Sequence, residues 1–425
     1  MKKLSFVGKE QNVYFEKLDN GLEVYIIPKK NSKNYLVEMV SKFGSEVKEF
    51  IPMNEKKYIK IPLGTAHFLE HKLFDTEKGD AMFMFDNFGL EANASTNYYL
   101  TRYYIVGNNK IKRNLNYFLD VFFKPYFTDE KIDSERGIIG SEIDMYHDEP
   151  EWKLYQLQRC SLFHKALRCD ISGTRETIKE INATLLNKVY DIFYQPSNVF
   201  LVISGKVKVK EVIDIIKNNE TLNKRISNYP IKYKVDDEPA IINKEYADDE
   251  GFITIPKFSY LFKYDVNDFS FVEPEVFKIY LNIIFYVLFG DGSSFSEKIY
   301  EDKISNYFYI DSLFYQNIYC IGISGESEYA DIIKDEIDKQ LKNPLILKED
   351  FEREIKIRMS IIIRELDNIR DISDNIVRSI IVRGKYLDEK EIIDKLNFTD
   401  FEKVLAKIKF DNKAFNIVFP KEKKN

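Results

Sequence analysis

Two short, largely apolar runs, over residues 13–18 and 22–27, predict that the chain begins with a pair of β-strands. The two runs are separated by Asp19-Asn20-Gly21, and an Asn-Gly pair favours a tight turn with positive φ. A third strand is expected over 35–40. A β-hairpin followed by a further strand therefore opens the predicted fold.

The pattern changes to a helical period after Gly64. Thr65 is expected to cap a helix over 66–74, because a threonine hydroxyl can accept a hydrogen bond from a backbone N–H of the first turn. The later elements of the first half are predicted in the order strand, helix, helix, helical region, strand and helix, over 98–106, 111–122, 129–147, 151–195, 198–204 and 208–217. The first half is therefore expected to be an α+β domain.

A polar, charged stretch over 229–245 predicts a linker. Beyond it we expect, in order, a strand, a helix, two strands, a long helical region and a closing strand, over 251–264, from Pro274, within 306–325, over 328–409 and over 413–419. The predicted division is a first domain over 1–228, the linker 229–245 and a second domain over 246–425.

The two halves resemble each other weakly. A strand, a helix, an acidic turn and a second helix occur in the same order in both, and matching Glu135 to Glu352 gives an offset of 217 residues. This favours an α+β protein of two duplicated domains, each a mostly antiparallel sheet covered by helices. At this offset the positions equivalent to His67, Glu70 and His71 carry apolar residues, which are Ile284, Val287 and Leu288.

Composition narrows the class of protein. With 44% hydrophobic and 31% charged residues the chain can form sizeable cores, and a net charge of -6 argues against nucleic-acid binding. No apolar run of 18 residues occurs, so no membrane span is predicted. The basic start is not followed by an apolar signal-peptide region, and the three cysteines lack paired spacing. We therefore expect a cytoplasmic protein whose metal ligands, if any, are histidines and carboxylates.

One motif carries the chemistry. His67-Phe-Leu-Glu70-His71 places two of the four histidines of the chain at positions i and i+4 of a predicted helix, where both imidazoles can reach one metal. Glu70 is close enough to reach a water on that metal. This is the inverted order of the more common His-Glu-x-x-His zinc site. The alternative is a solvated helix face with two incidental histidines.

Catalytic zinc usually has three protein ligands, so a third must come from elsewhere. The helix over 129–147 supplies carboxylates among small and apolar neighbours, where solvation alone does not explain them. Spacing does not choose between Glu135, Glu142, Asp144 and Asp148.

The motif and two later stretches together resemble the M16 peptidases, the pitrilysin or insulinase-like family. The stretches are His67-Phe-Leu-Glu-His71, Asn93-Ala94-Ser95-Thr96 and Glu135-Arg136-Gly-Ile-Ile-Gly-Ser-Glu142. The resemblance is strong over the first half and looser over the second. In length the chain resembles the short bacterial members, and in particular the active subunit of paired M16 peptidases of Firmicutes.

The resemblance implies a role for each residue of these stretches. His67, His71 and Glu142 match the zinc ligands, with one Zn²⁺ per chain. Glu70 matches the general base, which takes a proton from water and returns it to the leaving amine.

Two further positions follow from the same resemblance. Glu135 matches a carboxylate that supports the site without binding metal. Asn93 and Ala94 match an edge strand that binds substrate by adding it to the sheet.

The second half departs from the family pattern. Members that act alone carry an Arg and, seven residues later, a Tyr that grip the substrate. Here Tyr300 stands at the Arg position, while Tyr307 keeps the later one. A tyrosine cannot supply the charged, bidentate fork of an arginine. We therefore expect a heterodimer with a related M16-like chain that supplies the clamp, with a homodimer as the second choice.

The function expected is that of a zinc metalloendopeptidase acting on peptides or small unfolded proteins. One alternative is a catalytically silent structural or assembly subunit of an M16-type heterodimer, against which the complete set of ligands argues. The other is a maturation protease dedicated to one secreted peptide.

Overall fold

The computed structural model describes residues 1–6, 11–225 and 228–421. The chain forms two compact units, each assembled from three segments. The first unit comprises 1–143, 169–236 and 362–389, and the second comprises 144–168, 237–361 and 390–425. Each unit thus contains one helical segment from the other half of the sequence. The predicted linker, 229–245, contains the passage between the units at 236–237.

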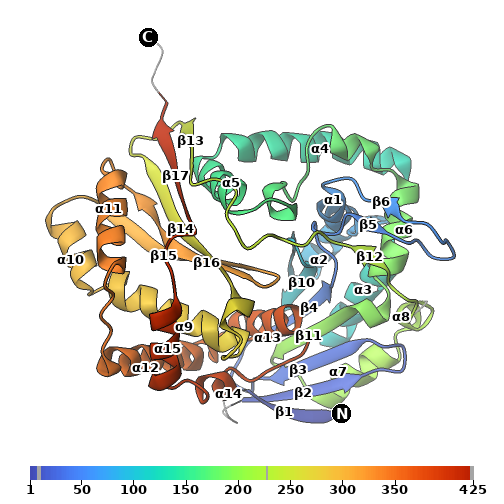
Figure 1. Ribbon diagram of the computed structural model, residues 1–425. Helices are drawn as coiled ribbons and strands as arrows, with labels where there is room; N and C mark the ends of the chain where they lie inside the picture. Colours follow the sequence, from blue (N-terminus) through green and yellow to red (C-terminus); the bar gives the residue numbers. More distant parts are fainter. Residues whose placement is uncertain (7–10, 226–227, 422–425) are drawn as a thin grey trace. The chain divides into compact units, whose positions relative to one another are not determined.

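A seven-stranded sheet forms the centre of the first unit (Figure 1). Its strands, in spatial order, are β1 (Lys2–Phe6), β2 (Gln11–Lys17), β3 (Glu23–Pro28), β11 (Val199–Gly205), β4 (Tyr35–Ser41), β10 (Thr101–Gly107) and β9 (Glu91–Thr96). All neighbours are antiparallel except β11 and β3, which are parallel. The predicted hairpin joins β2 to β3, and Gly21 has the positive φ that its turn requires.

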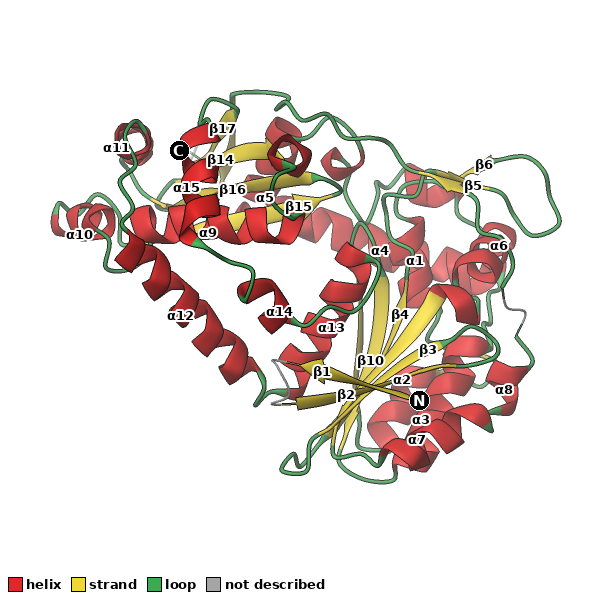
Figure 2. Cartoon of the chain, turned by 60° about the horizontal axis from the view of Figure 1, so that its bottom comes forward, coloured by secondary structure: helices red, strands yellow, loops and turns green. Residues whose placement is uncertain are grey.

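Helices cover both faces of this sheet, as Figure 2 shows. Every residue of the central strands β4 and β11 is buried, which requires a cover on each side. The helices of the first unit are α1 (Thr65–Lys72), α2 (Ala81–Asn87), α3 (Ile111–Phe123), α6 (Ala183–Phe193), α7 (Val209–Lys217), α8 (Glu220–Asn223) and, from the second half of the sequence, α13 (Ile369–Arg383). Helix α13 packs on β11 and β4.

Small ribbons and three connecting helices complete the chain. The ribbons are β5 (Glu49–Phe50), β6 (Ile59–Lys60) and β12 (Tyr233–Lys234) in one sheet, and β7 (Asp75–Thr76) and β8 (Gly79–Asp80) in another. The helices that run across the division between units are α4 (Asp129–Asp148), α12 (Lys348–Glu365) and α14 (Glu389–Ile393).

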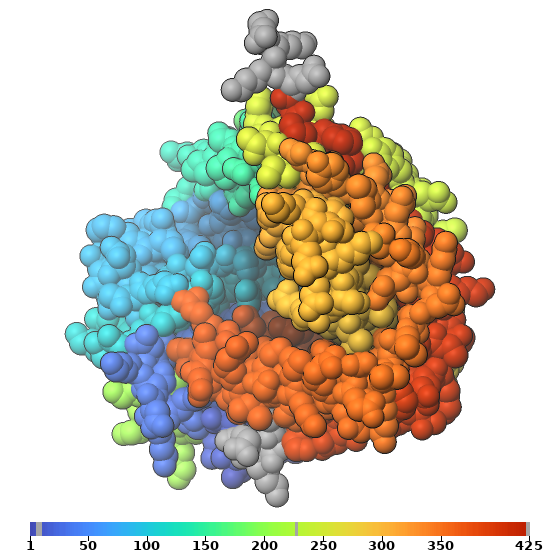
Figure 3. Space-filling view, turned by 90° about the vertical axis from the view of Figure 1, so that its left-hand side faces the viewer, coloured from blue at the N-terminus to red at the C-terminus, as the bar shows by residue number. Residues whose placement is uncertain are grey.

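The second unit is built on a five-stranded sheet. Its strands, in spatial order, are β13 (Tyr246–Gly251), β17 (Lys413–Pro420), β14 (Lys257–Asp265), β16 (Ile318–Glu326) and β15 (Tyr307–Tyr315). Its helices are α5 (Pro150–Leu162), α9 (Pro274–Phe289), α10 (Ser294–Glu301), α11 (Ala330–Leu341) and α15 (Phe398–Lys407). Helix α5, from the first half of the sequence, packs on β17, β13 and β14, while α10 and α11 lie at the surface in Figure 3.

The second sheet repeats the topology of the first. The order β3-β11-β4-β10-β9 corresponds to β13-β17-β14-β16-β15, and in both the first pair is parallel and the others antiparallel. The exchanged helices α5 and α13 also correspond. The predicted duplicated α+β fold with mostly antiparallel sheets is confirmed. In the second unit, the helix equivalent to α1 is α9, where Ile284 and Leu288 are buried in the core.

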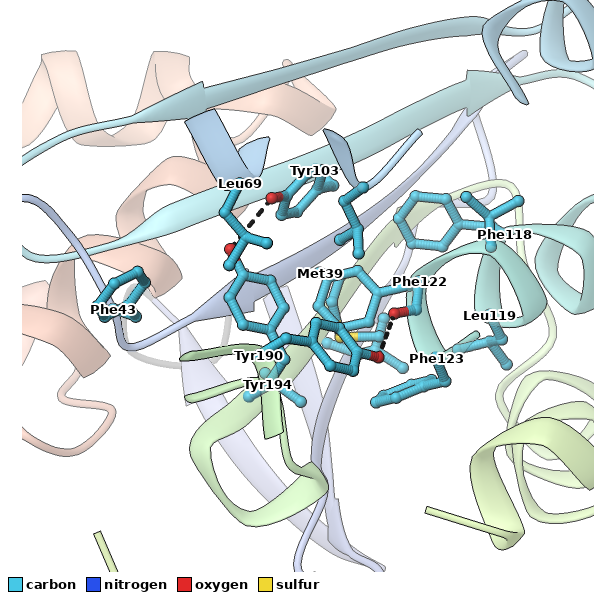
Figure 4. Packing of buried hydrophobic residues seen from close by; sticks show 14 of the residues in the cluster. Met39, Phe43, Leu69, Tyr103, Phe118, Leu119, Phe122, Phe123, Tyr190 and Tyr194 are labelled. Atoms are coloured by element: carbon cyan, nitrogen blue, oxygen red, sulfur yellow. Dashed lines mark hydrogen bonds between the residues drawn. The ribbon is translucent and has the colours of Figure 1, made fainter. Parts of the chain in front are cut away.

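The core of the first unit holds α1 in place. Leu69 of α1 lies among the aromatic residues of Figure 4, in which the hydroxyls of Tyr103 and Tyr194 share a hydrogen bond of 3.1 Å. In the same cluster the Tyr190 hydroxyl donates to the carbonyl of Phe122 (2.8 Å). Paired hydroxyls allow these tyrosines to be buried at little cost.

The predicted cap of α1 is wrong in detail. Gly64, with φ of 90°, occupies the N-cap position, and Thr65 is the first helical residue. The Thr65 hydroxyl donates to the carbonyl of Pro62 (2.7 Å) instead of accepting from the helix. A Cβ at Gly64 would lie 2.4 Å from the carbonyl oxygen of Ser172, so this position requires glycine.

Within the described residues, no single helix is long and apolar enough to cross a membrane. Helices α9 and α10 meet the requirement of length and composition only when taken together across a bend of 41°.

Candidate metal centre

Helix α1 has an apolar face that is buried in the core and an opposite face that carries the residues of the motif. Phe68 and Leu69 are fully buried in the first core, while His67, Glu70 and His71 lie on the side that carries the polar cluster. The i and i+4 spacing brings the rings of His67 and His71 to 4.6 Å between centroids.

Glu142 on α4 completes a triangle of ligand atoms. Nε2 of His67 lies 3.7 Å from Oε1 of Glu142, and Nε2 of His71 lies 3.6 Å from Oε2. One ligand atom from each of the three residues lies within 4.8 Å of the others. Of the four carboxylates that spacing left open, the structure therefore brings Glu142 to the histidines.

The two distances from the histidines to Glu142, 3.7 and 3.6 Å, are close to those that zinc requires. Tetrahedral zinc bonds of about 2.0–2.2 Å place their donors about 3.3–3.6 Å apart. Four carboxylates and two lysines make up the charged cluster at and behind this site, and they are Glu70, Glu135, Glu142, Asp75, Lys72 and Lys131. The excess of two negative charges suits a divalent cation. The residues present thus fit zinc in number, type and charge.

Burial prepares His67 as a ligand. It lowers the pKa of His67 to about 3, with a smaller contribution from His71, so the imidazole is neutral near pH 7. For His71, burial lowers the pKa, but the hydrogen bond to Glu135 and the neighbouring carboxylates outweigh burial and raise it. A raised pKa means that His71 holds a proton more tightly when no metal is bound. A metal cation that binds His71 takes the place of this proton.

Glu135 lies behind His71 rather than at the ligand triangle. Its Oε1 is 3.0 Å from Nδ1 of His71, and its Oε2 accepts from Nζ of Lys72 (3.0 Å). These two partners, His71 first, lower the pKa of Glu135 to about 2 against the effect of burial. Glu135 is therefore an ionised carboxylate that orients His71, a common arrangement around zinc.

Glu70 is held by a residue that the sequence did not single out for this purpose. The Thr96 hydroxyl donates to Oε2 of Glu70 at 2.6 Å. Burial raises the pKa of Glu70, and the Thr96 hydrogen bond opposes that effect. Thr96 ends β9, so the same strand carries Asn93, Ala94 and the contact to Glu70.

Asn93 and Ala94 lie on the outermost strand of the first sheet. They pair with Tyr104 and Tyr103 of β10, and no described strand pairs with the other edge of β9. The exposed Asn93 side chain accepts a hydrogen bond through Oδ1 from the Ala94 N–H (2.8 Å). An open edge of this kind can accept an extended peptide.

The remaining candidates do not join the cluster. Asp144 and Asp148 follow Glu142 on α4, and neither belongs to the metal-binding group found in the described residues. Tyr307 is in the second unit, exposed on the outermost strand β15, while Tyr300 stacks on Phe308 with 5.3 Å between ring centroids.

Comparisons with known proteins identify the family. Residues 52–171 match the sequence profile of Insulinase (Peptidase family M16), a range that contains the motif and Glu142. The zinc protease YmfH of Bacillus subtilis is 30% identical over 417 residues, which cover 95% of this chain and 96% of YmfH.

Two solved structures share the fold. An M16-like peptidase from Alicyclobacillus acidocaldarius has a TM-score of 0.86 at 23% identity, covering 97% of this chain and 99% of that one. A peptidase M16 inactive domain from Pseudomonas fluorescens has a TM-score of 0.75 at 14% identity, again covering 97% and 99%. Relatives of this fold thus include a domain described as inactive. From the full-length similarity to YmfH and the match over its site, this chain belongs to peptidase family M16.

Proposed function

We propose that the chain is a zinc metalloendopeptidase that hydrolyses peptides or small unfolded proteins. The observation that carries the proposal is the triangle of His67, His71 and Glu142, with Glu70 one residue from a ligand on the same helix. These three side chains would hold the zinc and leave one position open. Bound there, zinc would supply Lewis acidity for the scissile carbonyl and make water more acidic.

Glu70 is the residue that moves the proton. Its Oε2 is engaged by Thr96, so Oε1 is the oxygen that would accept a proton from water and then deliver it to the leaving amine. Burial raises the pKa of Glu70, which makes its carboxylate a stronger base than an exposed one. Glu135 takes no part in this transfer and instead holds His71.

The open edge of β9 would bind the substrate as an additional strand. Asn93 and Ala94 lie on this strand, and Thr96 connects it to Glu70. A peptide paired with β9 would therefore be aligned with the catalytic carboxylate through backbone hydrogen bonds, which favour extended chains over folded proteins.

A catalytically silent subunit is the principal alternative. The fold alone does not decide, since the Pseudomonas fluorescens inactive domain shares it. The complete ligand set and a held Glu70 favour the enzyme. A maturation protease for one secreted peptide would use the same site and differ only in its substrate.

We also propose that a related M16-like chain supplies the substrate clamp, with a homodimer as the second choice. Tyr300 stands at the position of the expected Arg, and its ring stacks on Phe308. We expect the complex in the cytoplasm, where the three free cysteines stay reduced. Fractionation that finds the chain outside the cytoplasm would contradict this placement.

The test of the function is Glu70→Gln, with Glu77→Gln as a matched control on an exposed ion pair with Lys124. We expect Glu70→Gln to keep one zinc per chain and to lose peptide hydrolysis by about 100-fold or more, because only the base is removed. Glu77→Gln should retain both. If the wild type, with and without a related chain, holds no zinc and cleaves no quenched peptide, the enzyme proposal is wrong.

A further inference from the structure

Lys72 is a buried lysine directly behind the metal centre. It follows His71 at the end of α1, and only 4% of its surface is exposed. Its Nζ donates to Oε2 of Glu135 at 3.0 Å and forms an ion pair with Asp75. Lysines are rarely buried to this degree without a specific partner.

These contacts continue a chain of alternating charges away from the ligand His71. Nδ1 of His71 lies 3.0 Å from Oε1 of Glu135, whose other oxygen binds Lys72. Asp75 pairs with Lys72 through one oxygen and with Nζ of Lys131 through the other, at 3.0 Å. Both oxygens of Glu135 are therefore engaged, and its carboxylate plane is fixed.

The direction of this carboxylate determines which nitrogen of His71 faces the ligand triangle. A neutral imidazole carries its proton on one nitrogen, and only the other can bind a metal. Glu135 accepts a hydrogen bond from Nδ1–H, which leaves the lone pair on Nε2, the atom 3.6 Å from Glu142. His67 has no such support, because its Nδ1 is buried without a hydrogen-bond partner among the described residues.

Stability does not account for a lysine at this position. Buried ion pairs contribute little net stability, because desolvation offsets most of their attraction. A methionine of similar length would fill the same space without that cost. The specific effect of Lys72 is to hold the second oxygen of Glu135 and so to orient this carboxylate beside a ligand.

We infer that Lys72 is a positioning residue that, acting through Glu135, fixes the Nδ1–H tautomer of His71 and strengthens zinc binding. The inference rests on the proposed zinc site. In this role Lys72 does not contact the substrate. Carboxylates behind ligating histidines typically change metal affinity by about 10–100-fold, and Lys72 extends this arrangement by one residue.

A double-mutant cycle on the full-length chain tests the inference. Zinc affinity, measured by competition with a chromophoric chelator, is compared among wild type, Lys72→Met, Glu135→Gln and the double variant. Lys72→Met should weaken zinc binding about 10-fold or more. In the Glu135→Gln background the same change should have an effect below about 2-fold, because the intermediary is already lost. Lys124→Met, at an exposed pair with Glu77, should leave affinity unchanged.

The position of the proton provides a second readout that needs no metal. Imidazole ¹⁵N shifts of the metal-free chain, recorded at the alkaline end of a pH series where His71 has become neutral, should show the Nδ1–H form of His71 in the wild type and a mixture in Lys72→Met. If Lys72→Met fails to fold, Lys72→Gln replaces it in both measurements.

Unchanged zinc affinity in Lys72→Met, or an equal loss in both backgrounds, would overturn the inference. Absence of zinc binding by the wild type would overturn it as well. A wild-type chain that binds zinc and cleaves no peptide would contradict the proposed function alone, since affinity and tautomer are measured without turnover.

Discussion

The carboxylates around the candidate metal centre differ in the groups that they face. Glu142 faces the two histidine Nε2 atoms, and Glu135 lies behind His71 at Nδ1. Glu70 instead has one oxygen held by the hydroxyl of Thr96. In the proposed function these neighbours make Glu142 a ligand, Glu135 an orienting group and Glu70 a base, although all three are glutamates.

The Thr96 hydrogen bond should be needed for turnover but not for metal binding. Thr96→Val keeps the shape of the side chain and removes the donor, so Glu70 loses its fixed orientation. We expect kcat to fall about 10-fold, with KM and zinc content unchanged. Thr96→Ser should restore most of kcat, because the hydroxyl returns. Equal kcat values for Thr96→Val and wild type, measured with a quenched peptide, would show that Glu70 is oriented by other contacts.

For single residues, the sequence predicts contacts between side chains that are near each other along the chain and misses contacts between side chains that are far apart along it. His67 and His71 could be paired because helical spacing alone brings them together. The choice of Glu142 needed the family resemblance, because the register of α4 against α1 depends on tertiary packing. Lys72 and Thr96 gave no signal of their roles, since their partners lie 63 and 26 residues away along the chain.

At the scale of elements, the proposed function makes the outermost strand β9 the link between substrate binding and catalysis. Asn93 is exposed on β9 and does not contact the ligand triangle through any of its described hydrogen bonds. Asn93→Ala should therefore raise KM about five-fold, the effect of one hydrogen bond, while kcat and zinc content stay near wild type. The control is Asn187→Ala on α6, whose amide donates only to its own helix. A change in kcat with constant KM would contradict the substrate-strand role.

Helix α13 is attached to the first sheet by a buried carboxylate. Glu38 of β4 accepts from the Ser373 hydroxyl of α13 (2.5 Å) and from Nη1 of Arg102 (3.3 Å). Burial raises the pKa of Glu38 above its usual 4.5, although both partners oppose the shift. The folded chain therefore binds the Glu38 proton more tightly than the unfolded chain does.

The pH dependence of stability follows from this shift. The contribution of the Glu38 carboxyl is complete below pH 4.5 and is lost as pH rises through its raised pKa. Glu38→Gln does not titrate, so its unfolding free energy relative to wild type should increase as the pH rises from about 4 to about 8. Urea unfolding at several pH values measures this difference. A difference that stays constant with pH would contradict the assignment.

Sequence patterns predicted where most helices and strands lie along the chain, but not which sheet each helix packs on. The hairpin, α3, α4, α9 and β17 lie where apolar periodicity predicted them. The exchange of α5 and α13 between the two units could not be read from the pattern, because an amphipathic helix does not specify which sheet it covers. Thr65 was taken as a cap because it has the right chemistry, but Gly64 fits the close approach of Ser172.

At the scale of the whole molecule, the first unit contains the candidate metal centre, while the second repeats the fold without the His67-Glu70-His71 motif. Five strands of the first sheet have the same order as the five strands of the second, but α9, the helix equivalent to α1, is buried among apolar residues. The duplication could be predicted from the offset of 217 residues, because order of elements survives changes of sequence.

A related chain should increase peptide hydrolysis. If a partner supplies the Arg of the clamp, this chain alone should turn over peptides slowly, and a co-expressed M16-like chain with the Arg and Tyr should raise kcat/KM about 10-fold or more, since an oriented guanidinium contributes binding that Tyr300 cannot. Light scattering on the same samples reports the assembly. A fully active monomer or homodimer would contradict the proposal.

The most direct measurement of the central claim is an anomalous difference map of crystals of the full chain, collected on both sides of the zinc absorption edge. We predict one zinc peak per chain, bonded to Nε2 of His67, Nε2 of His71 and a carboxylate oxygen of Glu142 at about 2.0–2.2 Å. A zinc-supplemented crystal with no peak among these three residues, or with zinc bound by other side chains, would contradict it.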